Sequence, residues 1–294
     1  NRLRQMPPGS RLPIPVVTGL GNGLVGPETV LGSRNVARCI FEDTRLDGLD
    51  TKLTRFDVLL CASNWNARLL KAHSRKPVEL VFEGIDPSLF HPGPKSGLLD
   101  PNRFYIFSGG KVEFRKGHDL TLLAFKEFSR RHDEAMLVTL WHSPWPQMSA
   151  GFQGKLPYPL ELARNGRIDV KGWAAKNGVD PSSVIDLPPS PNPLMPAIIR
   201  EMDCALAVSR AEACTNLPAT EAMACGTPVA ALNCGPVREI VEPGVSGGVF
   251  DSVEALIAGL PGVKKKENFM NKQELVEHVA AQTDSSKTAA GAAV

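Results

Sequence analysis

Short apolar runs alternate with amphipathic stretches from residue 103 onward, and this alternation constrains the fold more than any other feature of the chain. The apolar runs have strand length and are rich in β-branched residues, which is typical of strands buried on both faces. This order predicts a parallel sheet covered by helices. The expected strands are residues 103–108, 135–141, 184–187, 204–208 and 229–232, and the expected helices are residues 119–131, 194–202, 217–224 and 237–241.

The part of the chain before residue 86 has a thinner version of the same pattern. Its expected strands are residues 36–41, 58–62 and 78–82, with a helix over residues 64–73. Residues 86–101 hold four prolines and predict an interdomain linker. We therefore expect an α/β protein with two doubly wound, Rossmann-like domains. Their limits are residues 1–95 for a reduced first domain with its linker, 96–262 for a second domain, and 263–294 for a helical or disordered tail, with a helical pattern over residues 273–281.

Composition and charge exclude several classes of function. The 294 residues are 43% apolar and 22% charged, which is ordinary for globular proteins. The net charge of +2 gives no overall field to attract nucleic acid or an anionic membrane, and no apolar run approaches the length of a membrane-spanning helix. The six cysteines form no CxxC pair, so we expect buried thiols rather than zinc ligands or three disulfides, and a cytoplasmic location.

A glycine-rich loop, Gly21–Gly26, fits the pattern GxGxxG after an apolar run. Three interpretations are open for it. It could be the phosphate loop of a dinucleotide fold, with Glu42 and Asp43 as the acidic residues about 20 positions further on. It could be a plain turn, or a loop whose Gly21 and Gly23 let backbone approach the phosphates of a ligand.

A second cluster follows the strand that ends at residue 108. Gly109 and Gly110 lead directly into three cations, Lys111, Arg115 and Lys116, and a helix is expected just afterward. Glycines let backbone N–H groups approach an anion, and a helix N-terminus favours negative charge. The cluster is equally compatible with a phosphate-binding loop and with a solvated basic loop.

The third cluster spans residues 210–229. Pro218 stands just inside the expected helix, so the amides of residues 216–219 face out of its first turn, which suits an anion. Glu212 lies in the preceding loop. Glu221 lies one turn into the helix on an otherwise apolar face, where a carboxylate is costly unless it is hydrogen-bonded. It is either a capping carboxylate or a partner for sugar or ribose hydroxyls.

These clusters resemble the family 4-type glycosyltransferases of the GT-B fold, in which two Rossmann-like domains face each other across a cleft. The likeness covers residues 35–260, and EAMACGTPVAA over residues 221–231 is its most specific part. It implies retaining transfer of a hexosyl-type group from a nucleotide-sugar to an acceptor that the sequence does not name, whether saccharide, lipid-linked or protein. It implies catalytic roles for Glu212 and Lys116. Implied donor contacts are Gly109, Gly110, Lys111, Lys116, Thr215, Asn216, Leu217 and Glu221.

The sequence departs from the family in three respects. Lys111 stands where the family usually has Arg, so a bidentate contact becomes a point-charge contact. Glu212 and Glu221 are one residue further apart than their family counterparts, and the first domain is shorter. The chain has no DxD sequence, and we expect no metal ion and no cofactor. The rival hypotheses are a nucleotide-sugar-binding module that transfers nothing and, more remotely, a nicotinamide oxidoreductase built on Gly21–Gly26.

Overall fold

The computed structural model describes residues 6–26, 30–42, 44, 46 and 48–263. The expected tail from residue 264 onward, with the helical pattern over residues 273–281, lies outside the described residues. Within the described part, the chain separates into two compact units. The first consists of the described residues between 6 and 83 together with residues 211–215 and 234–239, and the second of residues 84–210, 216–233 and 240–263. Two loops that follow strands of the second unit thus belong to the first.

The first unit is built on a parallel sheet with the strand order β1-β2-β3-β4. Its helices α1 and α2 pack on the sheet around a core that includes the fully buried Phe41, Leu53 and Leu59. Ser63 begins α2 by accepting a hydrogen bond from the backbone N–H of Asn66. The elements are β1 (Val16–Leu20), β2 (Asn35–Cys39), α1 (Leu49–Lys52), β3 (Val58–Cys61), α2 (Asn64–His73) and β4 (Val78–Leu80).

The second unit is built on a six-stranded parallel sheet in the order β10-β9-β8-β5-β6-β7. Its strands are β5 (Phe104–Gly109), β6 (Ala135–Leu140), β7 (Val184–Asp186), β8 (Cys204–Ala207), β9 (Val229–Leu232) and β10 (Gly247–Phe250). Strand β5 comes first in the chain and lies in the middle, between β6 and β8. The strand order therefore reverses direction at β5, which marks a doubly wound sheet.

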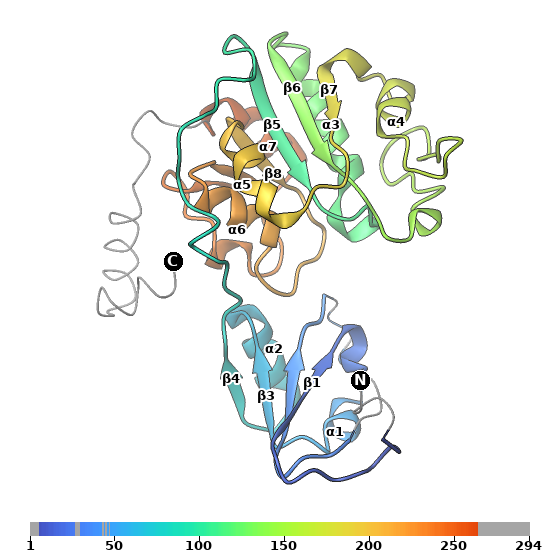
Figure 1. Cartoon of the computed structure of the whole chain (residues 1–294), viewed down its shortest axis with the longest axis vertical. Coiled ribbons are helices and arrows are strands. Elements are labelled where there is room, and N and C mark those ends of the chain that lie inside the picture. The colour runs from blue at the N-terminus through green and yellow to red at the C-terminus, as the bar shows by residue number, and fades with distance from the viewer. Residues whose placement is uncertain (1–5, 27–29, 43, 45, 47, 264–294) are drawn as a thin grey trace. The chain divides into compact units, whose positions relative to one another are not determined.

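Helices cover both faces of this second sheet, with α3 and α7 on one face and α5 and α6 on the other (Figure 1). The helices are α3 (His118–Ser129), α4 (Val170–Lys176), α5 (Met195–Arg200), α6 (Leu217–Ala224) and α7 (Val253–Gly259). Leu122 and Phe125 of α3 are fully buried against Leu137 of β6. Because both faces are covered, the central strands are mostly apolar, as in the all-buried Cys204–Ala207.

The predicted α/β architecture with parallel, helix-covered sheets is confirmed. The bounds of α2, α6 and β9 match the sequence prediction, and all six cysteines are free thiols, five of them buried. The helix expected over residues 237–241 is only a 3-10 turn, η7 (Val237–Glu239), because the segment is too short to close successive α-helical hydrogen bonds. Strand β10 was missed because its two leading glycines hide the strand pattern.

Replacing Phe125 with Ala should lower the unfolding free energy by about 3–5 kcal/mol, because the ring is fully buried between α3 and the sheet. Leu98, which is 87% exposed, is the control, and Leu98→Ala should change stability by less than about 0.5 kcal/mol. Urea unfolding followed by circular dichroism measures both variants. Equal effects at the two positions would contradict this account of the core.

Candidate functional site

The topology of the second sheet brings the second sequence cluster together with residues 216–229 of the third. The chain runs from β5 to β6 and β7 on one side, and β8, β9 and β10 lie on the other. Ligands of open α/β sheets bind outside the carboxyl ends of the strands at such a point of reversal. The loops that leave the carboxyl ends of β5 and β8 carry the predicted residues. The candidate site is therefore at this point of reversal, outside the carboxyl ends of β5 and β8, which we call the switch point.

The two loops touch at glycine positions. Gly117 adopts a φ of 68°, and a Cβ added there would lie 2.1 Å from the carbonyl oxygen of Val208. At the end of β5, a Cβ added at Gly109 would lie 3.7 Å from the Cβ of Pro218, in the first turn of α6. Gly110 has a φ of 124°, which side chains rarely adopt. Glycine is thus required at residue 117 for the loop after β5 to pack against the end of β8.

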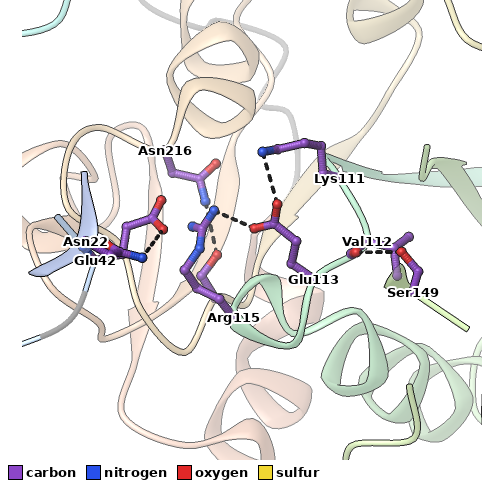
Figure 2. A network of polar contacts seen from close by, with 9 residues as sticks. Asn22, Glu42, Lys111, Val112, Glu113, Arg115, Ser149 and Asn216 are labelled. Atoms are coloured by element: carbon purple, nitrogen blue, oxygen red, sulfur yellow. Dashed lines mark hydrogen bonds and ion pairs between the residues drawn. The ribbon is translucent and has the colours of Figure 1, made fainter. Parts of the chain in front are cut away.

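A short charged network occupies the loop after β5 (Figure 2). The Nζ of Lys111 lies 3.0 Å from one carboxylate oxygen of Glu113, and the Nη2 of Arg115 lies 2.9 Å from the other. Burial raises the pKa of Glu113, but the hydrogen bonds and charges of both cations outweigh it, and the pKa falls below its ordinary value. Lys116 ends the 3-10 turn η3 (Phe114–Lys116) of the same loop. The cations expected from the sequence are all present in this loop.

Arg210, in the loop after β8, holds the turn that carries these cations. Its guanidinium donates two hydrogen bonds to the carboxylate of Asp119, at 2.8 and 2.6 Å, and Asp119 is fully buried. The same side chain donates to the carbonyl oxygen of Phe114 at 2.9 Å and lies 4.3 Å from the centre of its ring. The backbone N–H of Arg210 donates to the carbonyl of Arg115 at 2.7 Å. Arg210 therefore fixes η3 through side chain and backbone together.

The start of α6 is capped by Asn216. Its side chain accepts a hydrogen bond from the backbone N–H of Ala219 and donates to the hydroxyl of Ser209, 3.4 Å away. The amide of Ala219, expected from the sequence to face a ligand anion, is thus already bonded within the cap. Asn216 is buried, whereas Leu217 is 40% exposed.

Glu221 is partly buried on α6 and has no partner among the described residues. Its carboxylate forms no hydrogen bond or ion pair with any residue of the described part of the chain. Burial raises its pKa to about 7. The capping role considered from the sequence does not apply to it. A partner for this carboxylate must come from solvent or from a ligand.

Glu212 and Thr215 belong to the first unit. Glu212 is buried, and a Cβ at Gly235 would lie 2.4 Å from its carbonyl oxygen. The hydroxyl of Thr215 donates to Glu83 at 3.2 Å, and the hydroxyl of Ser63 donates to the carbonyl of Ala213 at 3.0 Å. These contacts hold the loop 211–215 against the first sheet.

The glycine loop Gly21–Gly26 also lies in the first unit, as a 3-10 turn, η2 (Asn22–Leu24). Asn22 accepts from the backbone N–H of Glu42 at 2.6 Å and donates to its carboxylate at 3.4 Å. The described residues between β1 and β2 include no α-helix, so the crossover helix of a dinucleotide loop has no counterpart among them. This geometry is that of a turn, and it does not test whether the backbone of Gly21 and Gly23 approaches a ligand.

The structure thus divides the predicted site residues between the two units. The second unit brings together Gly109, Gly110, Lys111, Lys116, Asn216, Leu217 and Glu221, and the first contains Gly21, Gly23, Glu212 and Thr215. Sequence reasoning missed Asp119 and Arg210. Their partnership joins residues far apart in the chain, and no local pattern indicates it.

No group of three His, Cys, Asp or Glu side chains among the described residues is arranged to hold a metal ion. No helix in the described part of the chain has both the length and the apolar character needed to cross a membrane.

A known protein family matches the part of the chain that contains the loops after β5 and β8. The family described as "Glycosyl transferases group 1" matches residues 103–261, more than half of the chain. The chain belongs to this family. A D-inositol 3-phosphate glycosyltransferase of Segniliparus rotundus is 28% identical over 180 residues, which cover 60% of this chain and 36% of the relative. The chain therefore spans little more than a third of the length of that relative.

Solved structures with similar folds have lower sequence identity. Sucrose-phosphate synthase from Thermosynechococcus elongatus matches with a TM-score of 0.62 and 16% identity, over 84% of this chain and 64% of that one. A trehalose-6-phosphate protein from E. coli bound with UDP-2-fluoro glucose matches with a TM-score of 0.56 and 17% identity, over 78% of this chain and 60% of that one. The fold is that of the GT-B glycosyltransferases.

Replacing Asp119 with Ala should lower the unfolding free energy by about 3–5 kcal/mol, because it leaves the guanidinium of Arg210 without its buried partner. The control is Glu127→Ala, which removes an exposed ion pair with Arg130 and should cost no more than about 1 kcal/mol. Denaturant unfolding measures both. A small effect at Asp119 would show that the pair does not anchor the loop.

Replacing Glu221 with Gln should stabilise the unliganded protein at pH 8. A carboxyl whose pKa is raised on folding stabilises the folded state when it is protonated. Its contribution to the unfolding free energy is complete below the ordinary pKa of 4.5 and is lost as the pH rises through about 7. The unfolding free energy at pH 8 should rise by about 1 kcal/mol. The full pKa shift, at about 1.36 kcal/mol per unit, would give more, but solvent screens this partly buried side chain.

Thermal melts at pH 4.5 and pH 8 provide the test, since the two proteins should melt together at the lower pH. Glu254→Gln is the control, because hydrogen bonds lower the pKa of that exposed carboxyl and its loss should not stabilise the protein at pH 8. A Glu221→Gln variant that is no more stable than the wild type at pH 8 would contradict the prediction.

Proposed function

We propose that this chain transfers a hexosyl-type group from a nucleotide-sugar donor to an acceptor with retention of configuration. The observation that carries the proposal is the pairing of opposite chemistries at the switch point. One loop supplies cations beside glycines, and α6 supplies a carboxylate, Glu221, that forms no hydrogen bond or ion pair with any of the described residues. A nucleoside diphosphate needs both, since its phosphates require positive charge and its ribose offers two hydroxyls. The family match and a UDP-sugar-bound relative in fold support this assignment.

In the proposed reaction, Lys111 and Lys116 stabilise the charge that develops on the leaving diphosphate. Fixed charges at the place where charge develops are usually the largest contribution to catalysis. Glu221 accepts hydrogen bonds from the ribose hydroxyls. Glu212 holds hydroxyls of the donor sugar and spreads its oxocarbenium-like charge. The acceptor attacks on the face that the diphosphate leaves, and a phosphate oxygen takes its proton, so the protein supplies no nucleophile.

The proposal includes independence from metal ions and a cytoplasmic location. The cations Lys111, Arg115 and Lys116 provide the charge that a metal would otherwise contribute to the diphosphate. The free cysteine thiols suit a reducing compartment. The first acceptor to test is D-inositol 3-phosphate, because the name of the Segniliparus relative contains this compound. The donor to test with it is UDP-glucose.

A second candidate function is donor binding without transfer. The match covers only 36% of the Segniliparus relative, so it does not by itself carry the transfer activity of that protein to this chain. Turnover that depends on an acceptor separates the two candidates, whereas donor binding alone does not.

The carboxylates provide the sharpest kinetic test. Glu221 contacts the ribose in ground and transition state alike, so Glu221→Gln should raise the donor KM roughly tenfold with kcat little changed. Glu212 acts on charge that appears during transfer, so Glu212→Gln should lower kcat by about 10²-fold. Steady-state kinetics in excess EDTA measure both, with the exposed Glu254→Gln as control.

Full activity of the Glu212→Gln variant would contradict the proposed role of Glu212 in transfer. Loss of all turnover in EDTA, restored by magnesium or manganese, would contradict the metal-free mechanism. Absence of turnover with intact UDP binding would favour the binding module.

A further inference from the structure

Glu113 neutralises two cations in the loop to which the proposed function assigns the donor diphosphate. One carboxylate oxygen lies 3.0 Å from Lys111, and the other lies 2.9 Å from Arg115 (Figure 2). The carboxylate thus bridges the two side chains, one oxygen to each. A phosphate group offers the same pair of cations the same kind of oxygen ligands, with at least as much charge.

The network is not an ordinary surface ion pair. The side chain of Arg115 is only 17% exposed and that of Glu113 34%, while Lys111 is 49% exposed. The turn that carries Arg115 is fixed by Arg210 through its backbone and side chain. Arg115 and Glu113 are therefore held close to their observed places, and Lys111 is the most exposed of the three side chains. An anion that enters this loop meets cations that already have a counter-ion.

We propose that Glu113 is an internal counter-ion that competes with the donor diphosphate for Lys111 and Arg115. This inference rests on the proposed function of the loop and adds a role for a residue that the function itself does not use. Diphosphate binding displaces Glu113 from at least Lys111. After transfer, Glu113 pairs with the cations again and favours release of the nucleoside diphosphate. Glu113 thus weakens binding of the donor and of the product.

The physical reason is the charge that an incoming anion experiences. With Glu113 ionised, Lys111, Glu113 and Arg115 together carry one positive charge, and without it they carry two. The gain in attraction is limited because the site is partly exposed and solvent screens the charges. An increase of about tenfold in affinity for a diphosphate is the expected scale. A group with a purely structural role would have the opposite effect, since its loss would disorder the loop and weaken binding.

The test compares Glu113→Gln with the wild-type chain by titration calorimetry, using inorganic pyrophosphate and UDP as probes. The variant should bind both about tenfold more tightly, and the difference should shrink at high salt. Uridine, which lacks phosphate, should bind equally to both proteins. The control is Glu127→Gln, which makes the same change in net charge near the far end of α3 and should alter the affinity less than twofold.

A double-mutant cycle assigns the gain to the cations. In a Lys111→Gln background, the gain from Glu113→Gln should be reduced, because one of the two released charges is absent. If Glu113→Gln does not fold, Glu113→Ala replaces it in the same titrations. Unchanged or weaker pyrophosphate binding on removal of Glu113, or no binding to any of these proteins, would overturn the proposal.

The counter-ion proposal and the proposed function can fail separately. Tighter pyrophosphate binding by Glu113→Gln, together with no UDP-glucose turnover, would support the counter-ion and contradict the transferase. Acceptor-dependent turnover together with unchanged affinity in Glu113→Gln would do the reverse.

Discussion

The bidentate contact between Arg210 and Asp119 is the interaction on which the geometry of the candidate site depends. It joins the loop after β8 to the first turn of α3, and through Phe114 it fixes the turn that presents the cations. Asp119 has no contact with solvent, so its charge is tolerable only because Arg210 and the backbone N–H of Lys155 satisfy it. A buried charged pair stabilises little on balance, but it specifies one arrangement, since any other would leave a charge unpaired.

Two carboxylates at this switch point have opposite electrostatic environments. Glu113 lies between Lys111 and Arg115, and these cations hold its pKa below the ordinary value. Glu221 has only burial to influence it, and its pKa rises to about 7. A glutamate side chain is therefore paired at residue 113, whereas the one at residue 221 has no partner among the described residues. Unpartnered polar groups in native proteins are rare, and they tend to mark the places where a ligand completes the structure.

Local sequence signals were sufficient to select the candidate residues whose placement depends on local geometry. Gly109 and Gly110 at a strand end, followed by Lys111, indicate an anion loop because only glycine allows such a backbone approach. Glu221 stood out as a carboxylate on an apolar helix face. Asn216 was expected to serve a ligand, yet it also caps its own helix. The sequence does not distinguish these two uses of an amide, because both need the same residue at the same place.

The sequence by itself determined the alternation of strands and helices, and with it the parallel sheet, because apolar periodicity is encoded within each segment. Only the tertiary structure decided that Arg210 would meet Asp119. It also decided that the loop of Glu212 would pack with the first unit, against Ser63 and Glu83. These outcomes depend on which strands become neighbours in the sheet. Strand order is a long-range property that no single segment carries.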